Sequence, residues 1–278
     1  MRQTTRLGLF AAVILLDPLR AKRRERAFAR ASVRRALNGA RRTDITPVTI
    51  LMVYRKRNAR FVQLFLDEVG AGADVRLWAL DETDPALEMH TAGSGPGTRF
   101  THFNHLYQSR PSRDDSWVVL ADDDFLFVRG GLLRTINLMK RAGFALAQPG
   151  QSAMGWWTST FNIARPFLVA RDTNYVEQGP LVIVSPDFAK HILPLPESDD
   201  MGWGIEAVWF RKKEHGTRFG IIDDCRIVHW KRNATDYASA PEMERMYERL
   251  ASADVKSIWQ LQSVNSRWSR WQQSPSWK

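Results

Sequence analysis

The stretch that decides the fold is Val118-Val119-Leu120-Ala121-Asp122-Asp123-Asp124-Phe125-Leu126-Phe127-Val128, which sets three carboxylates between two apolar runs. Uncompensated buried charge is costly, so the triplet favours a site where a cation neutralises it. In an extended chain Asp122 and Asp124 would point to the same side, where both could approach one divalent ion. A strand that ends in an acidic turn is the simpler alternative, because Asp is common in turns.

Around this stretch, short apolar runs alternate with helical patterns, which is typical of an α/β layered domain. In such sheets ligands bind beyond the carboxyl ends of the strands, so the triplet lies where a site is expected. The pattern predicts strands at 45–54, 75–80, 117–121, 145–148, 181–184, 220–224 and 227–230, and helices at 60–69, 101–109, 130–142, 186–193, 204–215 and 241–253.

Composition indicates a globular protein with a basic N-terminal arm. The 278 residues are 44% hydrophobic and 11% aromatic, enough to build a packed core. Residues 1–45 hold 12 Lys and Arg against three acidic residues, whereas the remainder holds 28 basic and 27 acidic residues. The formal charge of +10 therefore belongs to the arm, and we expect no nucleic-acid partner for the body of the protein.

A single cysteine, Cys225, excludes an intrachain disulfide and a cysteine-based zinc site. It fits a reducing compartment, so a cytoplasmic location is expected. In the arm, the apolar run at 7–16 is too short for a bilayer, which needs about 20 residues, and no small-residue cleavage site follows it.

We interpret the arm as an apolar wedge followed by a basic helix at 21–38 that lies on an anionic membrane surface. The protein would then be peripheral on the inner face of the membrane. A solvated basic extension is an alternative. An RNA-binding arm is another, although no aromatic residues are interleaved with its basic residues.

Two further motifs follow the triplet, Gly202-Trp203-Gly204-Ile205-Glu206 and Ile227-Val228-His229-Trp230-Lys231. As an ordered set, the Asp-x-Asp motif, the Gly-Trp-Gly-x-Glu loop and the late-strand histidine resemble GT-A-fold glycosyltransferases of the galactosyltransferase type. The resemblance spans about residues 46–235. It implies one GT-A-like, Rossmann-like domain at 45–240 with a central mixed, mostly parallel sheet flanked by helices. This domain would lie between the arm at 1–44 and a C-terminal helix with a Trp-rich tail at 241–278.

The resemblance also implies a metal and a donor substrate. The metal would be Mn2+ or Mg2+, which stabilises a leaving diphosphate, and an imidazole ligand suits Mn2+ better. The donor would be a nucleotide-diphosphate sugar, with a UDP-sugar favoured. A half-buried strand histidine is the alternative for His229. The implied metal ligands are Asp122, Asp124 and His229, and the implied donor contacts are Tyr54, Arg55, Asp81, Arg99, Asp122, Asp123 and Lys231.

Glu206 is the candidate general base that deprotonates an acceptor hydroxyl. It lies near a predicted helix start, where the helix dipole is expected to lower its pKa. The family motif continues Glu-Asp, whereas this chain has Glu206-Ala207, so Asp200 and Asp199 in the preceding loop are alternative bases. A helix-terminal acid with no catalytic role is the simpler interpretation of Glu206.

The acceptor is expected to be a glycan or another molecule that carries a hydroxyl group. Trp203 and Trp156 offer apolar faces of the kind that pack on sugar rings, although both could be core residues. Glu177 is expected to line the same side.

The predicted function is that of a metal-dependent, hexosyltransferase-like glycosyltransferase in glycan or polysaccharide synthesis, with an inverting single displacement. A metal-dependent phosphoesterase or nucleotidyltransferase is one alternative, because such enzymes also use clustered carboxylates. A non-catalytic nucleotide-sugar binding protein is the other.

Overall fold

The computed structural model of the chain describes residues 26, 46–196, 201–230 and 238–277. Apart from Arg26, the arm that is predicted to lie on a membrane falls outside these residues, as do Asp199, Asp200 and Lys231. Within the described ranges, no helix combines the length and the apolar character needed to cross a membrane.

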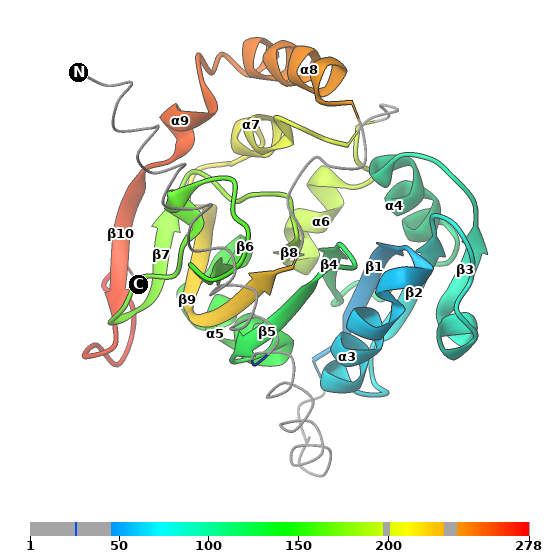
Figure 1. The fold of residues 1–278 in the computed structure, drawn as a ribbon. Helices are drawn as coiled ribbons and strands as arrows, with labels where there is room; N and C mark the ends of the chain where they lie inside the picture. Colours follow the sequence, from blue (N-terminus) through cyan, green and yellow to red (C-terminus); the bar gives the residue numbers. More distant parts are fainter. Residues whose placement is uncertain (1–25, 27–45, 197–200, 231–237, 278) are drawn as a thin grey trace.

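Strands and helices alternate along the first half of the chain (Figure 1). The strands are β1 Val48–Tyr54, β2 Asp74–Ala79, β3 Thr91–Ser94, β4 Trp117–Ala121, β5 Phe125–Arg129, β6 Phe144–Gln151, β7 Leu168–Thr173, β8 Leu181–Val184, β9 Arg218–His229 and β10 Val264–Ser269. The helices are α3 Ala59–Val69, α4 Arg99–Gln108, α5 Leu132–Ala142, α6 Pro186–Ile192, α7 Ile205–Arg211, α8 Ser239–Ser252 and α9 Ile258–Leu261.

The strands form one sheet in the order β10-β7-β9-β6-β8-β4-β1-β2-β3, and β5 pairs with β9. In one half, β1 runs parallel to β2 and β4, and β2 runs parallel to β3, so β1, β2 and β4 end at the same edge. In the other half most pairs are antiparallel, while β6 and β9 are parallel. The predicted α/β domain with a central mixed sheet flanked by helices is confirmed.

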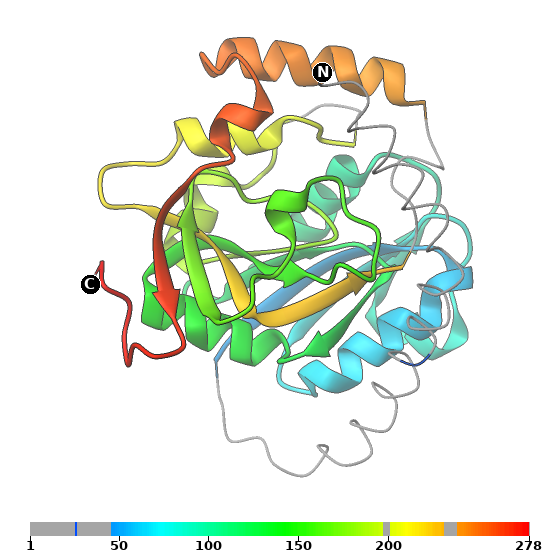
Figure 2. The ribbon, with the colours of Figure 1, turned by 60° about the vertical axis from the view of Figure 1, so that its left-hand side comes forward.

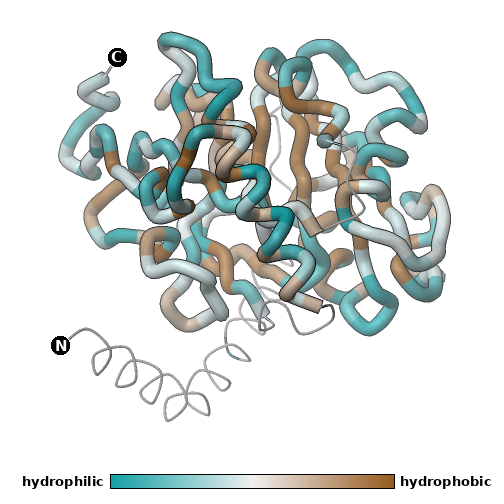
Figure 3. The backbone as a smooth tube through the Cα atoms, turned by 90° about the horizontal axis from the view of Figure 1, so that it is seen from above, coloured by the Kyte–Doolittle hydropathy of each residue, from teal (hydrophilic) through white to brown (hydrophobic). Residues whose placement is uncertain are grey.

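Strand β1 is buried along its whole length, which shows that both faces of the sheet are covered at this strand. Alternate residues of β1 point to opposite faces of the sheet and pack in two different cores. Ile50 and Met52 belong to the core that includes α3 and α5, whereas Leu51 and Val53 belong to the core with α4, α6 and α7. Figure 2 shows the helices on the two sides of the sheet, and Figure 3 shows the apolar stretches in the interior.

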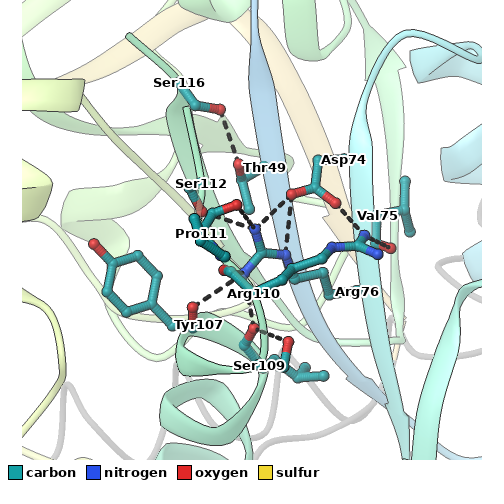
Figure 4. A network of polar contacts seen from close by, with 11 residues as sticks. Thr49, Asp74, Val75, Arg76, Tyr107, Ser109, Arg110, Pro111, Ser112 and Ser116 are labelled. Carbon is teal, nitrogen blue, oxygen red and sulfur yellow. Dashed lines mark hydrogen bonds and ion pairs between the residues drawn. The ribbon is translucent and has the colours of Figure 1, made fainter. Parts of the chain in front are cut away.

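Arg76 on β2 fixes the C-terminal end of α4 (Figure 4). Its side chain is 2% exposed, and its guanidinium donates to the carbonyl oxygens of Leu106, Tyr107 and Arg110 while it pairs with Asp74. These bonds satisfy carbonyl groups that a helix end leaves without intrahelical partners. They hold α4 against the sheet, and α4 begins at Arg99, a predicted site residue.

Three predicted elements differ from the structure. The two strands predicted at 220–224 and 227–230 are one continuous strand, β9. The helix predicted at 204–215 ends at Arg211. The Asp triplet lies in a bend between β4 and β5 and not in an extended chain. The bend lets consecutive carboxylates turn toward one space, which the alternation of a strand does not allow.

Candidate active site

A cavity of about 620 Å3 lies at the carboxyl ends of β1 and β4. This volume is within the range of about 300 to 1,000 Å3 that is usual for small-molecule sites. Residues from β1, the triplet, α7 and α8 line it, so segments far apart in sequence meet there. The predicted site residues that line the cavity are Arg55, Arg99, Asp122, Asp123, Asp124, Glu177, Trp203, Glu206 and His229.

Each carboxylate of the triplet has a different partner. Asp122 Oδ1 lies 3.0 Å from Arg99 Nε. Asp123 Oδ2 accepts a hydrogen bond of 2.6 Å from the backbone N–H of Arg55. Asp124 Oδ1 lies 3.0 Å from His229 Nε2. The triplet therefore holds together the first residue of α4, the end of β1 and the end of β9.

The strand register explains why His229 meets Asp124. β5 and β9 pair antiparallel with Phe125 opposite His229, and the N–H of Trp230 donates to the Asp124 carbonyl oxygen at 2.7 Å. Burial lowers the pKa of His229, but the charge of Asp124 and its hydrogen bond outweigh burial, so the pKa is raised. The imidazole is thus held beside a carboxylate, as expected of a metal-ligand pair or an ion pair.

Negative charge is crowded in the triplet. Burial raises the pKa of Asp122, although the charge of Arg99 opposes the shift. Burial also raises the pKa of Asp123 to about 6, against the hydrogen bond from the Arg55 backbone. The charge of Asp124 adds to both increases. A cation bound here would relieve the cost of ionising these groups.

The residues fit a divalent cation with two protein ligands. In the described part of the chain no three His, Cys, Asp or Glu residues form a ready metal cluster. Asp124 and His229 nevertheless place a carboxylate and an imidazole in contact, a donor set that suits Mn2+. Asp122, the third predicted ligand, lies beside them and pairs with Arg99.

Gln178 connects the triplet to Glu206, and no motif in the sequence indicated it. Arg99 donates from Nη2 to the Gln178 carbonyl oxygen at 2.8 Å and from Nη1 to its side-chain Oε1 at 3.2 Å. The N–H of Gln178 lies 3.3 Å from Glu206 Oε1. The contacts thus run without a break from Asp122 through Arg99 and Gln178 to Glu206.

Glu206 is the second residue of α7 and is 7% exposed. Burial raises its pKa to about 7, and the nearby charge of Glu177 adds to the increase. The prediction that the helix dipole lowers this pKa is wrong, because the loss of water around the carboxylate outweighs the field of a seven-residue helix. A pKa near neutrality is what an efficient general base requires.

Glu177 is held more tightly than Glu206. It accepts hydrogen bonds from Gln151 Nε2 at 2.7 Å, from Asn162 Nδ2 at 2.6 Å and from Thr158 Oγ1. Its oxygens are therefore engaged, and burial raises its pKa. The donors come from β6 and from the segment that follows it, so only the tertiary fold brings them to Glu177.

Several predicted site residues lie elsewhere. Tyr54 does not line the cavity: it is fully buried, and its hydroxyl bonds Thr91 Oγ1 at 3.0 Å. Asp81 is exposed and accepts from the backbone N–H of Lys56 at 2.9 Å. Trp156 is half-buried outside the lining.

Helix α8 supplies a cavity wall that sequence reasoning missed. Glu242 on α8 is 4% exposed and accepts from the backbone N–H of Met201 at 3.1 Å. Arg249 donates from Nη1 to the Trp203 carbonyl oxygen at 2.8 Å. These bonds tie α8 to the Gly-Trp-Gly loop. The added wall residues from this region are Ala238, Pro241, Glu242, Arg245, Met246 and Ile258.

A scan against protein-family models and a sequence search of curated proteins give no match. Among solved structures, GalNAc-T7 with UDP, GalNAc and Mn2+ matches with a TM-score of 0.50 and 8% identity, over 74% of this chain and 48% of that chain. S. aureus TarS 1-349 in complex with UDP-GlcNAc matches with a TM-score of 0.49 and 12% identity, over 74% of this chain and 65% of that chain.

The chain thus spans less than two thirds of either neighbour. The likeness to GalNAc-T7 shows that the two chains share a fold.

Proposed function

We propose that this protein is a metal-dependent, hexosyltransferase-like glycosyltransferase that moves a sugar from a nucleotide-diphosphate sugar to an acceptor hydroxyl. The observation that carries the proposal is the placement of the Asp triplet, His229 and Glu206 around one cavity at the carboxyl ends of the strands. The GT-A fold adds support, because ligands of open α/β sheets bind at this edge.

Arg99, Asp122, Asp123 and Arg55 form the donor side of the proposed site. Asp122 holds Arg99, whose guanidinium is nearly buried and has a planar fork suited to phosphate oxygens. Asp123 fixes the backbone at Arg55, where β1 ends. A UDP-sugar is the first donor to test, since the similar GalNAc-T7 structure contains UDP. Lys231 stays a predicted phosphate contact outside the described residues.

Asp124 and His229 are the residues proposed to hold a divalent cation, Mn2+ in preference to Mg2+. When bound there, the cation would stabilise the negative charge that develops on a leaving diphosphate. Asp124 and His229 would keep their side chains on the cavity side of the β5 and β9 pair, held by the register between Phe125 and His229.

Glu206 is the proposed general base of an inverting single displacement. In its ionised form it accepts the proton of the acceptor hydroxyl as the oxygen attacks the sugar carbon and the bond to the diphosphate breaks. Gln178 keeps the Glu206 carboxylate in place through its backbone N–H. Glu177 is less suited to this role because its oxygens already accept three hydrogen bonds. Asp200 stays the alternative base.

Trp203, Glu177 and the α8 wall form the proposed acceptor side, which would take a glycan or another hydroxyl-bearing molecule. The apolar residues Met201, Met246 and Ile258 lie beside the charged Glu242 and Arg245 in this wall. We further propose a cytoplasmic location, with the arm at 1–44 on the inner face of the membrane.

A thermal-shift screen of nucleotide-sugars and free nucleotides, with and without Mn2+, tests the proposed ligands. A ligand that binds the folded state raises the melting temperature by mass action. We expect the largest shift from one nucleotide-diphosphate sugar in the presence of Mn2+. Equal shifts with free nucleotides alone would favour a phosphoesterase or nucleotidyltransferase, and donor binding without turnover would favour a binding protein.

A further inference from the structure

Two large aromatic side chains are exposed and in contact at the tip where β7 begins and β10 ends. Phe167 is 60% exposed and Trp271 is 76% exposed, and their ring centroids lie 5.5 Å apart. The tip lies at the opposite end of the molecule from α8 (Figures 1 and 2). Large exposed apolar groups that gather in one place indicate an interaction site.

The backbone of Phe167 has an unfavourable conformation. Phe167 has φ of 67°, a left-handed conformation that aromatic residues rarely adopt. The N–H of Arg270 donates to the Phe167 carbonyl oxygen at 3.0 Å. The N–H of Arg165 donates at 2.7 Å to Asp223, which is buried against Arg171. The tip is therefore anchored to the core while its rings face solvent.

Arg270, which directly precedes Trp271 in the chain, shares one acidic partner, Asp224, with two further arginines. Arg129 and Arg270 lie 2.8 Å and 2.6 Å from Asp224 Oδ1, and Arg134 lies 2.5 Å from Asp224 Oδ2. The side chain of Arg129 is 42% exposed, that of Arg270 is 34% exposed and that of Arg134 is 60% exposed. One carboxylate balances three guanidinium groups, so positive charge is left over. Residues 255–278 add no acidic residue.

We propose that Phe167, Trp271, Arg129, Arg134 and Arg270, the aromatic-basic patch, dock the protein on an anionic lipid surface. Aromatic side chains favour the interface between lipid and water, and arginines are attracted to anionic headgroups. A neutral glycan fits the patch less well, because it carries no negative charge for the excess of arginine over Asp224 to attract. A nucleic acid would stack on the rings, but the patch is a protruding tip and not a groove that follows a strand.

Docking through this patch leaves the cavity open to soluble donors. The cavity is walled by residues of α7 and α8, which lie at the other end of the molecule from the tip. The patch also consists of described residues, so it is independent of the arm at 1–44. The aromatic-basic patch and the arm at 1–44 would each add to membrane affinity when they contact the same bilayer.

Co-sedimentation of the full chain with vesicles tests the patch. Vesicles of phosphatidylcholine alone are compared with vesicles that contain about one third phosphatidylglycerol. We expect the wild type to bind the anionic vesicles at least about tenfold more strongly, and to lose this binding as salt rises. Equal binding to both kinds of vesicle, or binding to neither, would overturn the proposal.

Two variants keep the arm unchanged and alter only the patch. The double variant Phe167→Gly with Trp271→Ala removes both rings, and glycine accepts the positive φ, so the fold is kept. Arg134→Gln removes one exposed charge and leaves Arg129 and Arg270 on Asp224. We expect the affinity for anionic vesicles to fall by about tenfold in the double variant and by about fivefold in Arg134→Gln.

Matched controls are Met89→Ala, which removes a side chain that is 96% exposed, and Arg113→Gln, whose arginine is 71% exposed. Both should bind vesicles as the wild type does. Wild-type binding by the two patch variants would overturn the proposal. Nucleotide release without vesicles is measured in parallel. We expect it to be unchanged in the patch variants, so the result is separable from the proposed catalytic function.

Discussion

His229 Nε2 lies 3.0 Å from Asp124 Oδ1 because β5 and β9 pair with Phe125 opposite His229. The two side chains come from positions about 100 residues apart in the chain, and the strand register alone brings them together. If the pair holds a divalent cation, each residue should matter for metal affinity. If it is only an ion pair, metal affinity should not depend on it.

The first prediction is that His229→Gln weakens Mn2+ binding. Loss of an imidazole ligand should raise the dissociation constant for Mn2+ by at least about tenfold, measured by isothermal titration calorimetry. His90→Gln, at the exposed end of the 3-10 helix Pro85–His90, is the matched control and should bind Mn2+ as the wild type does. An unchanged dissociation constant in His229→Gln would remove His229 from the proposed metal site.

The second prediction concerns the pH dependence of sugar transfer. Glu206 has a pKa of about 7, and only its ionised form accepts a proton from the acceptor. The rate at saturating metal and donor should therefore rise through about pH 7 and level off above it. In Glu206→Gln the rate should fall by at least about 100-fold at pH 8. A profile that is flat from pH 5 to pH 9 would contradict the assignment of the base.

The third prediction is that Glu206→Gln stabilises the protein at alkaline pH. The pKa rises from 4.5 to about 7 in the fold, so ionisation of Glu206 costs stability that is retained below pH 4.5 and lost as pH rises through 7. The neutral amide avoids this cost. Relative to the wild type, the free energy of unfolding should increase by up to about 3 kcal/mol at pH 8 and by much less at pH 5.

Urea unfolding at both pH values measures this difference, and Glu214→Gln at an exposed position just after α7 is the control. A gain in stability together with a loss of transfer would be the signature of a catalytic base whose ionisation is opposed by burial. Equal stability of wild type and Glu206→Gln at pH 8 would show that the carboxylate is solvated.

The fourth prediction is that Gly202→Ala destabilises the fold. Gly202 has φ of 85°, and an added Cβ would collide with the Phe100 ring and lie 2.8 Å from Gln178 Oε1. We expect a loss of about 2 kcal/mol or more in the free energy of unfolding. Gly72→Ala, at a position with open space, should change it by less than about 1 kcal/mol. Equal effects of the two substitutions would show that the loop before α7 is not packed as described.

The sequence predicted the elements around the site better than the contacts within it. β4 followed from its apolar run, and the position of Asp122 at its carboxyl end followed from the sheet rule. Gln178 could not be predicted, because its role depends on Arg99 from α4 and Glu206 from α7 meeting at one peptide. The Glu206 pKa was mispredicted because burial cannot be read from a local motif.

The alternation of residues along β1 indicates where the Tyr54 side chain lies. Ile50, Met52 and Tyr54 share one face of β1, and that face packs in the core with α3. The parity of the strand thus indicated that the Tyr54 side chain points into the core, whereas the neighbouring Arg55 lies just beyond the strand end and lines the cavity.

Analysis of the nucleotide product released from UDP-sugars in the presence of Mn2+ tests the central claim most directly. The proposed enzyme releases UDP, by transfer or by slow hydrolysis of the donor, and the rate in Asp124→Asn should fall by at least about 100-fold. Inversion of the anomeric carbon should accompany transfer. Release of UMP in place of UDP, or a rate unaffected by Asp124→Asn, would contradict the proposed function.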